Sequence, residues 1–437
     1  MKMTVFGTGY LGATHAACMA SLGHEVMGVD IDAGKVDSLR DGIVPFYEPE
    51  LEPLLRKQIE SGRLTFTTSF DEAAAFADLH FVCVGTPQRR GSLAADLSHV
   101  DSVIDALAPR LSRSALVVGK STVPVGTAAR LAQRLADLAP QGVDTELAWS
   151  PEFLREGFAV EDTLHPDRIV LGTASERAQT VVREVYQEIL AEGTPMIVTS
   201  LPTAELVKAA ANSFLATKIS FINAMAEVCE VTGADVTELA DAIGHDDRIG
   251  RKFLNAGLGF GGGCLPKDIR AFMARAGELG VDQAVAFLRE VDAVNMRRRT
   301  RVVDLTRELL DGNLIGRRIA VLGAAFKPNS DDVRDSPALN VAGQLQLQGG
   351  QVTVFDPKAT ELARALFPTL EYAADLNAAV TGADVVLLLT EWPEFVALDP
   401  ELLAGKVAAT NMVDGRNVLD PTKWRAAGWT LRSMGRS

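Results

Sequence analysis

Residues 257–268 hold the side chains best suited to covalent chemistry. A cluster of glycines leads there to one cysteine, Cys264, and the segment ends on Asp268. Glycine permits backbone conformations closed to other residues and lets a ligand come close. Pro266 suits the first turn of a helix, so the thiol would lie at a helix N-terminus, where the dipole and Lys267 favour the nucleophilic thiolate. Asp268 would share that helix face and exchange protons, whereas the alternative is a flexible loop with a buried, inert cysteine.

Two carboxylates form a second candidate group. Glu152 and Glu156 follow Pro151 at the end of an expected strand. If Pro151 starts a helical turn, both carboxylates lie on one face, where they can transfer protons. The alternative is a pair of acids that stabilise a helix N-terminus.

A lysine and an asparagine form a third group. Lys208 and Asn212 lie four residues apart in an apolar stretch. They would place one cation and one amide donor on the same helix face, which is the composition of an oxyanion site. The alternative is a salt-bridged lysine beside an interhelical amide, because an unpaired buried charge is costly.

The elements that must position these groups begin with a dinucleotide fingerprint. A short apolar strand, 3–7, runs into Gly7, Gly9 and Gly12, which open a helix with G-x-G-x-x-G spacing, and a second strand ends on Asp30. The glycines bring the backbone close to a pyrophosphate at the helix N-terminus. Asp30 would accept hydrogen bonds from the adenosine ribose hydroxyls, so the pattern predicts NAD rather than NADP.

Further strands extend this first domain. Apolar runs predict strands over 80–84, 115–119, 169–172 and 196–199. The loops after the first two carry Thr86 and Thr122, and loops at the carboxyl ends of parallel strands surround the ligand. We expect both threonines to face the cofactor, with ordinary turn or cap chemistry as the alternative.

A long helix opens the middle of the chain. We expect Thr203 to cap it and Gly233 to stop it after about Val231. The helix is apolar almost all round, which predicts burial between domains or subunits. Further helical segments, to about Asp311, complete an all-α section.

The last third of the chain predicts a second α/β unit. Its expected strands lie at 317–323, 350–356 and 383–390, and Arg416 follows the last apolar strand. The turn after the first strand lacks spaced glycines, so a second NAD is not expected. Lys327, Arg334 and Arg416 suit phosphates, although each taken singly is more simply a solvated surface residue.

Composition limits the partners. The 437 residues are 47% hydrophobic and 23% charged, with a formal net charge of −14. The length fits two or three domains, and the acidic balance argues against nucleic acid or an anionic membrane surface as the main partner. No apolar run approaches the roughly 18 residues of a membrane span, and no signal peptide is expected. The four cysteines show neither metal-ligand spacing nor a disulfide framework, so we expect no metal and a reducing cytoplasm.

Seven motifs in order resemble the UDP-glucose/GDP-mannose dehydrogenase family. They lie at 7–12, 84–87, 120–127, 151–157, 205–212, 259–268 and 326–328. The resemblance implies an α/β fold with two Rossmann-like, doubly wound parallel-sheet domains joined by a central all-α region with a long helix. It divides the chain into an NAD-binding domain, a helical dimerisation region with the cysteine and a nucleotide-sugar (UDP) binding domain, at 1–200, 201–312 and 313–437.

The resemblance also implies roles for individual residues. Cys264 would be the nucleophile, with Lys208 and Asn212 stabilising oxyanions and Asp268 assisting proton transfer. Thr122, Glu152 and Glu156 would position the hydrolytic water, with Glu152 the likelier base. The NAD site would comprise Gly7, Gly9, Tyr10, Leu11, Gly12, Asp30, Lys35, Thr86, Thr122, Glu156, Lys267 and Arg334. The substrate site would comprise Glu152, Phe153, Leu154, Lys208, Asn212, Arg248, Phe253, Leu254, Gly257, Phe260, Gly261, Cys264, Phe326, Lys327 and Arg416.

The implied reaction is a four-electron oxidation of a nucleotide-sugar primary alcohol to a carboxylate with two NAD⁺. UDP-glucose is the leading substrate, because residues 166–172 look like the glucose branch of the family, and GDP-mannose and UDP-N-acetylmannosamine stay open. Family members are homo-oligomers built on a dimer through the central helices, and Arg248 is expected to reach a neighbouring subunit's site. Ser150, Gly263 and Ala224 depart from the family's usual Asn, Ser and Glu.

Two rival interpretations remain. A two-electron β-hydroxyacid dehydrogenase would share the first domain and an all-α region, but it needs neither the cysteine nor a second α/β domain. An NAD-binding sensor without catalysis would not need Cys264, Lys208, Asn212 and Asp268 together.

Overall fold

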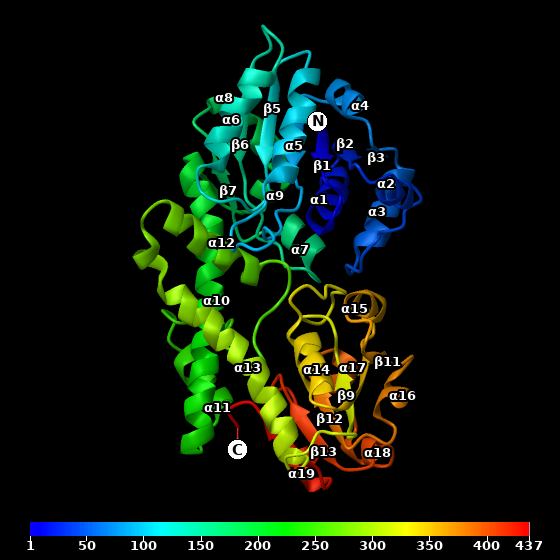
Figure 1. Cartoon of the computed structure of the whole chain (residues 1–437). Helices are drawn as coiled ribbons and strands as arrows, with labels where there is room; N and C mark the ends of the chain where they lie inside the picture. Colours follow the sequence, from blue (N-terminus) through cyan, green and yellow to red (C-terminus); the bar gives the residue numbers. More distant parts are fainter. Residues whose placement is uncertain (437) are drawn as a thin grey trace. The chain divides into compact units, whose positions relative to one another are not determined.

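Two parallel-sheet units organise the chain. The computed structural model describes residues 1–436, and these divide into one unit of residues 1–211 with 270–280 and a second of residues 212–269 with 281–436. Two helices contribute to both units, α10 (Leu201–Thr232) and α12 (Leu265–Glu278) (Figure 1). The three-part division at 200 and 312 stays a prediction.

The first unit is built on an eight-stranded sheet in the order β3-β2-β1-β4-β5-β6-β7-β8. Its strands are β1 (Lys2–Phe6), β2 (Glu25–Val29), β3 (Leu64–Thr67), β4 (Leu79–Val82), β5 (Ala115–Gly119), β6 (Thr145–Trp149), β7 (Ile169–Gly172) and β8 (Met196–Thr199). The pairs are parallel except β6 with β7, which meet antiparallel at Trp149 and Gly172. The strand order reverses between β1 and β4, which is where a doubly wound sheet binds its ligand.

Helices cover both faces of this sheet. They are α1 (Tyr10–Ser21), α2 (Ala33–Arg40), α3 (Leu51–Glu60), α4 (Phe70–Phe76), α5 (Ser98–Leu107), α6 (Thr127–Leu138), α7 (Ala159–Leu164), α8 (Glu176–Val185) and α9 (Gln187–Ala191), with a 3₁₀ turn at Ala108–Arg110. Buried side chains of α1, α3, α7 and α8 pack on one face, and those of α4, α5 and α6 pack on the other. Because both faces are covered, the strands are continuous apolar runs rather than alternating ones.

Helix α10 begins earlier than the sequence indicates. Ser200 Oγ accepts a hydrogen bond from the Thr203 backbone N–H at 3.3 Å, so Ser200 is the cap and Thr203 lies in the first turn. The predicted cap was therefore wrong by three residues. At the other end Gly233 has φ +76° and its N–H bonds to the Cys229 carbonyl, which confirms the predicted stop.

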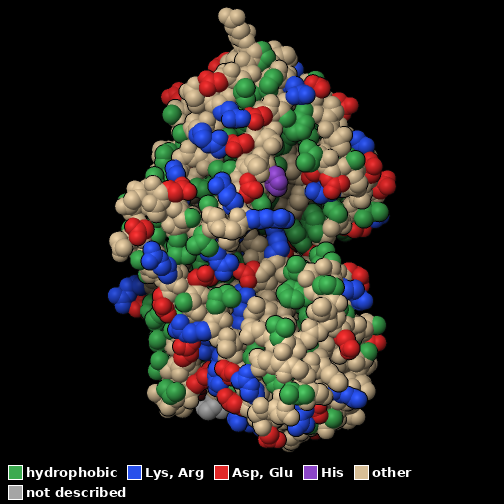
Figure 2. Space-filling model, viewed as in Figure 1, with side chains coloured by type: hydrophobic (Ala, Val, Ile, Leu, Met, Phe, Trp, Pro, Cys, Tyr) green, Lys and Arg blue, Asp and Glu red, His purple; other side chains and the backbone are tan. Residues whose placement is uncertain are grey.

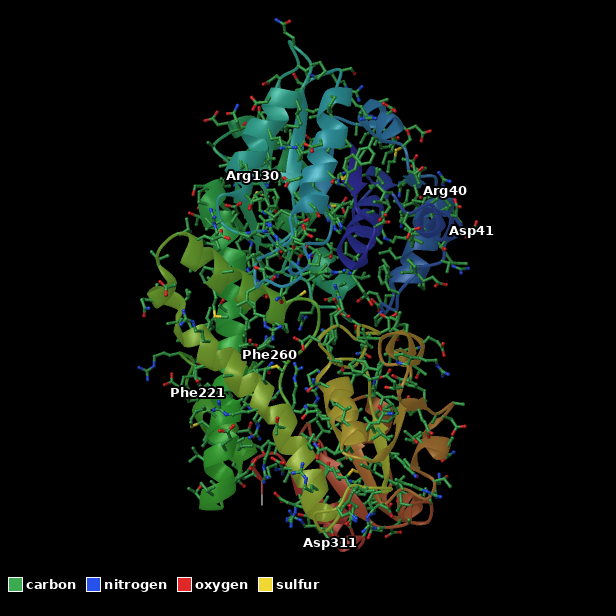
Figure 3. The ribbon with its side chains drawn as sticks, viewed as in Figure 1. Arg40, Asp41, Arg130, Phe221, Phe260 and Asp311 are labelled. Atoms are coloured by element: carbon green, nitrogen blue, oxygen red, sulfur yellow. The ribbon has the colours of Figure 1, made fainter. Side chains whose placement is uncertain are left out.

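Helix α10 is buried on one face only within a single chain. Ala216, Ile222 and Ala226 are fully buried, whereas Phe214, Phe221 and Val228 are 67%, 49% and 50% exposed. The last three are seven residues apart and form an apolar stripe on which Phe221 is labelled in Figure 3. The chain's own residues bury one face of the helix, and burial of the other face against a second subunit stays a prediction.

The second unit contains a six-stranded parallel sheet in the order β11-β10-β9-β12-β13-β14. Its strands are β9 (Arg318–Leu322), β10 (Gln351–Phe355), β11 (Glu371–Tyr372), β12 (Val385–Leu388), β13 (Asn411–Asp414) and β14 (Thr430–Ser433). Strand β14 follows Arg416, so the prediction that the strand before Arg416 is the last one was wrong. The sequence gives little signal for β14, because Leu431 is the one apolar residue among its four.

The remaining helices of the second unit frame this sheet and the cysteine loop. They are α11 (Val236–Gly244), α13 (Phe287–Leu309), α14 (Pro337–Leu347), α15 (Thr360–Leu366), α16 (Leu376–Val380), α17 (Pro393–Val396), α18 (Pro400–Ala404) and α19 (Pro421–Ala426), with a 3₁₀ turn at Asp282–Val285. Helices α10 and α13 are joined by the Ser220 hydroxyl, which donates to the Val291 carbonyl at 2.7 Å. The fold class predicted from the sequence is confirmed.

The surface is of mixed charge. On the face drawn in Figure 2, basic and acidic side chains are interspersed. Across residues 1–436, no helix has both the length and the apolar character needed to cross a membrane, and no three His, Cys, Asp or Glu side chains gather as metal ligands. Cys18, Cys83 and Cys229 are buried free thiols, whereas Cys264 is exposed.

Candidate active site

The glycine turn after β1 fits a dinucleotide. Gly7 has φ +87°, and a Cβ on Gly12 would come within 1.6 Å of the Gly7 carbonyl oxygen, so the helix packs against the turn only without side chains there. A Cβ on Gly9 would meet nothing within 4 Å, which leaves open space at the N-terminus of α1. That space is where the pyrophosphate of a dinucleotide binds in this type of turn.

Asp30 is preorganised as an acceptor at the end of β2. Its Oδ2 accepts from the Thr8 backbone N–H at 2.8 Å and the Thr8 hydroxyl at 2.9 Å, and it pairs with Lys35 Nζ at 3.1 Å. Burial opposes ionisation, but the hydrogen bonds from Thr8 and Asp32 hold the pKa of Asp30 below its ordinary value. The carboxylate therefore suits a ribose diol, and Lys35 positions it.

The first unit brings together half of the predicted site. Its members are Gly7, Gly9, Tyr10, Leu11, Gly12, Asp30, Lys35, Thr86, Thr122, Glu152, Phe153, Leu154, Glu156 and Lys208. Tyr10 stacks near Phe46, with ring centroids 4.2 Å apart, at the start of α1. The Thr86 hydroxyl donates to the Thr122 carbonyl at 2.7 Å, so the loops after β4 and β5 do converge.

The segment after β6 differs from the expected helical turn. Residues 150–157 form no helix, so Glu152 and Glu156 do not share a helix face. Instead Glu152 folds back on its own loop, and its Oε1 accepts from the N–H groups of Phe153 at 2.7 Å and Leu154 at 3.0 Å. This local hydrogen bonding competes with helix formation, which explains the wrong prediction.

A buried carboxylate fixes the end of the same loop. Glu48, which is 5% exposed, accepts from Gly157 N–H at 2.7 Å and Ala159 N–H at 2.8 Å. Glu156, directly before Gly157, is 8% exposed. The sequence gives no signal for Glu48, because its partners lie more than a hundred residues away.

Lys208 is held by an aromatic ring. Its side chain is 8% exposed, and Nζ lies 5.2 Å from the centroid of Phe153. The Arg168 guanidinium lies 3.8 Å from the same centroid. Cation–π attraction thus links the loop after β6 to the buried Lys208 ammonium on α10. This ammonium can stabilise negative charge that develops on a bound substrate.

The second unit holds the other half of the predicted site. Its members are Asn212, Arg248, Phe253, Leu254, Gly257, Phe260, Gly261, Cys264, Lys267, Asp268, Phe326, Lys327, Arg334 and Arg416. Cys264 is exposed directly before α12, and the Asp268 N–H bonds to the Cys264 carbonyl at 3.0 Å, which confirms the predicted helix start. A thiol at this position faces unsatisfied backbone N–H groups and the positive end of the helix dipole.

Asp268 is the centre of a buried polar group beside the cysteine. It is 4% exposed, accepts from Asn212 Nδ2 at 2.6 Å and pairs with Lys267 Nζ at 2.5 Å. Asn212 is itself 6% exposed on α10, one turn after Lys208 on the same helix. The predicted amide and carboxylate are therefore in direct contact, and Lys267 stabilises the carboxylate.

At Gly259, in the loop before Cys264, glycine is structurally required. Gly259 has φ +96°, and a Cβ there would lie 2.4 Å from Asn295 Oδ1. At Gly263 a Cβ would lie 2.2 Å from the guanidinium carbon of Arg334. Asp332 joins these two residues, because its Oδ2 accepts from Gly263 N–H at 3.3 Å and Arg334 Nη2 at 2.7 Å. Arg334 thus occupies the space that a side chain at position 263 would need.

Buried polar side chains on α13 hold the backbone of this loop. Asn295 accepts from the Phe260 N–H at 2.7 Å and donates to its carbonyl at 3.0 Å, as a neighbouring strand would. Arg299, which is 2% exposed, donates to the same carbonyl at 3.3 Å. Sequence reasoning missed both residues, because the arginine-rich segment 297–301 has the composition of a solvated helix face. Phe260 is labelled in Figure 3.

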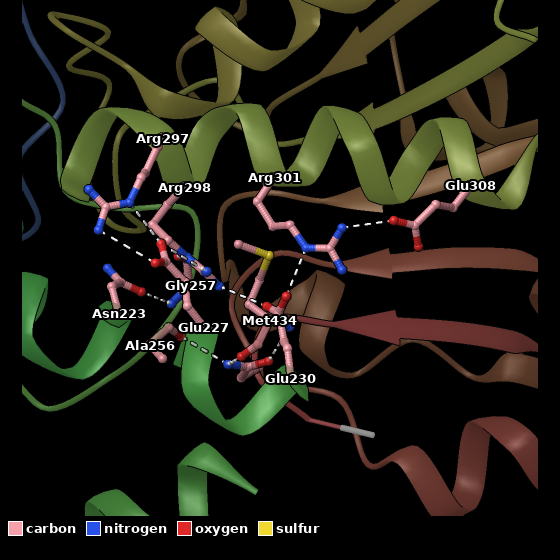
Figure 4. A network of polar contacts seen from close by, with 11 residues as sticks. Asn223, Glu227, Glu230, Ala256, Gly257, Arg297, Arg298, Arg301, Glu308 and Met434 are labelled. Carbon is pink, nitrogen blue, oxygen red and sulfur yellow. Dashed lines mark hydrogen bonds and ion pairs between the residues drawn. The ribbon is translucent and has the colours of Figure 1, made fainter. Parts of the chain in front are cut away.

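A second contact network anchors the beginning of the loop (Figure 4). Asn223 Oδ1 accepts from the Gly257 N–H at 2.9 Å, and the fully buried Arg298 donates from Nε to the Gly257 carbonyl at 3.5 Å. Arg298 and Arg301 both pair with Glu230, at 3.2 and 2.8 Å. The loop is therefore fixed between α10 and α13 before any ligand binds.

The predicted phosphate-binding residues differ in their availability. Arg416 donates to the carbonyls of Leu389 at 2.8 Å and Phe326 at 2.9 Å, so much of its guanidinium stabilises backbone. Lys327 Nζ lies 5.6 Å from the Phe326 ring centroid. Arg248 has an 89% exposed side chain that pairs with Asp246 at 2.6 Å, which places it at the surface of its own unit.

Sequence profiles of one family match three consecutive parts of the chain. The NAD binding domain of the UDP-glucose/GDP-mannose dehydrogenase family matches residues 1–190, its central domain matches 202–297 and its UDP binding domain matches 320–421. The chain belongs to the UDP-glucose/GDP-mannose dehydrogenase family. Family membership and the geometry of the glycine turn together make NAD the cofactor of the first unit.

Relatives of this family match over the full length. The chain is 42% identical to UDP-glucose 6-dehydrogenase of Rhizobium meliloti, covering 100% of both chains. It is 40% identical to UDP-glucose 6-dehydrogenase TuaD of Bacillus subtilis, covering 100% of this chain and 93% of that one. The solved UDP-glucose dehydrogenase of Pyrobaculum islandicum superposes with a TM-score of 0.91 at 41% identity, covering 100% of this chain and 98% of the other.

One buried cation of the first unit, Lys120, was assigned no role from the sequence. Lys120 directly follows β5 and is 5% exposed, and its Nζ lies 3.2 Å from Glu152 Oε2. The available signal was its place in the sequence, because a lysine immediately after a buried parallel strand lies at the ligand-binding edge of the sheet.

Proposed function

We propose that this member of the family oxidises UDP-glucose at C6 to UDP-glucuronate, a four-electron oxidation that reduces two NAD⁺. Full-length relatives at 42% and 40% identity are named UDP-glucose 6-dehydrogenase. The observation that carries the chemistry is the exposed Cys264 at the start of α12, beside the buried Asn212–Asp268 pair. An alcohol needs no thiol for its first oxidation, but an aldehyde needs a covalent adduct that can lose a second hydride.

Two NAD⁺ molecules, bound one after the other, would each supply the acceptor for one hydride. In the first oxidation the C6 hydroxyl proton passes to Asp268, and loss of hydride leaves an aldehyde. The Cys264 thiolate then adds to the aldehyde carbon, which forms a C–S bond and places negative charge on oxygen. The Lys208 ammonium and the Asn212 amide stabilise this oxyanion. Loss of the second hydride gives a thioester on Cys264.

Hydrolysis completes the turnover. Thr122, Glu156 and Glu152 position the attacking water, and the Glu152 carboxylate takes its proton. The water oxygen bonds to C6, the C–S bond breaks and Cys264 leaves as a thiolate, ready for the next substrate. The loop from Phe260 to Gly262, with Lys327, holds the nucleotide sugar, and Arg416 supports that loop through the Phe326 carbonyl.

The active form is a homodimer joined through α10. The stripe of Phe214, Phe221 and Val228 is apolar and at least 49% exposed, which is unusual for a surface that stays in water. Arg248, exposed near this region of the second unit, is proposed to reach the partner's site. An exposed nucleophilic thiol requires a reducing compartment, so we place the enzyme in the cytoplasm.

The decisive experiment counts NADH per nucleotide sugar consumed, with UDP-glucose, GDP-mannose and UDP-N-acetylmannosamine as separate substrates. Two NADH from UDP-glucose is the expected result. Two NADH from another sugar would keep the chemistry and correct the substrate. One NADH from the best substrate would support a two-electron dehydrogenase, and none would support a non-catalytic NAD sensor. As a control, Cys264→Ser must fail to release the acid; normal acid production by that variant would refute the thioester route.

A further inference from the structure

Lys120 has a complete set of acceptors inside the first unit. Its Nζ lies 3.2 Å from Glu152 Oε2, 3.4 Å from the Tyr186 hydroxyl and 3.5 Å from the Ser150 carbonyl. An ammonium has three N–H donors, so each has one partner. The neighbouring strands β5 and β6 are parallel, and Lys120 and Glu152 follow their carboxyl ends, which brings the pair to the ligand edge of the sheet.

The Glu152 carboxylate is held from both sides. Oε1 accepts from two backbone N–H groups, those of Phe153 and Leu154, and Oε2 faces the Lys120 ammonium. Both oxygens are therefore engaged by donors that fix the orientation of the carboxylate. The Glu152 side chain is 17% exposed against 6% for Lys120, so the carboxylate keeps access to solvent while the lysine behind it does not.

Several buried titratable groups near this pair carry no charge near neutral pH. Burial raises the pKa of the Tyr186 hydroxyl, of the Cys18 thiol and of the Cys83 thiol, the last to about 12. Burial also lowers the pKa of His15, which keeps that imidazole neutral. Burial alone would lower the pKa of Lys120, but the Glu152 carboxylate raises it above its ordinary value. Charged neighbours also lie on this loop: Glu48 binds its far end, and Lys208 and Arg168 lie against the ring of Phe153. Lys120 is the cation in direct contact with the Glu152 carboxylate.

We propose that Lys120 is a positioning residue for the hydrolytic half of the reaction, fixing the Glu152 carboxylate in one orientation toward the attacking water. This rests on the proposed function. Water loses a proton to Glu152 as its oxygen bonds to the thioester carbon, and the Cys264 thiolate departs with the C–S electron pair. Lys120 transfers no proton in this step. It supplies a fixed positive charge that holds the acceptor oxygen in place for the attacking water.

The test separates hydride transfer from hydrolysis in the full-length enzyme. Lys120→Met removes the charge but keeps the length of the side chain. With UDP-glucose and NAD⁺, this variant should form the first NADH at close to the wild-type rate, accumulate the Cys264 thioester seen by intact-protein mass spectrometry and lose about 100-fold in kcat. Lys120→Arg, which keeps the charge, should restore part of the lost kcat and reduce the accumulated thioester.

Two further variants provide the controls. Tyr186→Phe removes one lysine acceptor but not the Glu152 pair, so it should leave kcat unchanged and accumulate no thioester. If Lys120→Met folds poorly, the double variant Lys120→Met/Glu152→Gln, which buries no unpaired charge, is compared with Glu152→Gln alone. Equal kcat values would support action through Glu152, whereas a further loss of tenfold or more would overturn it. A wild-type kcat with no thioester accumulation in Lys120→Met would also overturn it.

The wild-type stoichiometry distinguishes the two possible failures. Fewer than two NADH per UDP-glucose in the wild type would refute the proposed function itself. Two NADH in the wild type, together with a Lys120→Met variant whose hydrolysis is normal, would refute only the role of Lys120.

Discussion

Acid should destabilise the first unit through a histidine in the middle of its sheet. His80 lies in β4 and is fully buried, and its Nδ1 lies 2.7 Å from the Thr4 hydroxyl on β1. Its Nε2 has no hydrogen-bond partner in the described part of the chain. Burial lowers the pKa of His80 from 6.5 to about 4. Between about pH 4 and pH 6.5, His80 is therefore protonated in the unfolded chain but not in the folded chain.

The direction and the size of this change in the free energy of unfolding follow from proton linkage. Above about pH 6.5 neither state is protonated at this site and there is no penalty. As the pH falls from 6.5 toward 4, the unfolded state gains the proton and stability is lost. With pKa values of 6.5 unfolded and about 4 folded, the loss between about pH 7.5 and about pH 5 is about 2 kcal/mol for this one group.

The assay compares wild type with His80→Asn by urea unfolding at those two pH values, followed by circular dichroism. Asn keeps a polar atom near Thr4 and does not titrate, but it leaves a cavity and lowers stability at both pH values. The pH-dependent loss should be about 2 kcal/mol smaller in the variant, because other titrating groups cancel in the comparison. His99→Asn, an exposed control, should behave as wild type. Equal pH-dependent losses in wild type and His80→Asn would refute the reasoning.

Two other predictions test the second unit. Phe221→Glu places a charge in the exposed stripe of α10 and should convert the dimer to monomer in analytical ultracentrifugation, while Leu347→Glu, at a position 88% exposed on α14, should leave the dimer intact. A monomer in the wild type would contradict the proposal. Asn295→Leu leaves the Phe260 N–H unpaired and removes one of the two donors to its carbonyl, so it should lower stability by about 1 to 3 kcal/mol in thermal unfolding; a loss well below about 1 kcal/mol would show that the loop does not depend on Asn295.

The regular parts of the molecule could be predicted from sequence because their signals are local. Apolar runs predicted β5, β7 and β8 with the bounds that the structure has. The spaced glycines and Asp30 specified a turn whose chemistry is contained in about thirty residues. Cys264 at the start of α12 was predictable for the same reason, because Pro266 marks the helix beginning.

The failures came from contacts that are distant in sequence or that compete locally. The carboxylate of Glu152 bonds to its own backbone, which a helical pattern cannot reveal. Asn295 and Arg299 lie in a polar, arginine-rich stretch whose composition is typical of a solvated helix face. Each is nevertheless buried against a loop about 35 residues away. Phe214 and Phe221 looked buried because the pattern counts apolar residues but does not say which chain covers them.

The buried cations share one physical logic. Lys120 faces a carboxylate and a carbonyl, and Arg298, Arg299 and Arg416 each donate to backbone carbonyls of the segments that hold the site. Removing such a cation from water is costly, and hydrophobic residues would stabilise a core at least as well. Carbonyl groups in irregular loops, however, have no strand or helix to satisfy them, so a buried donor is needed wherever such a loop must stay inside. The irregular backbone around Gly257 and Phe260 therefore requires the arginines of α13, and replacing one of them by an apolar residue exchanges the cost of a buried charge for that of an unpaired carbonyl.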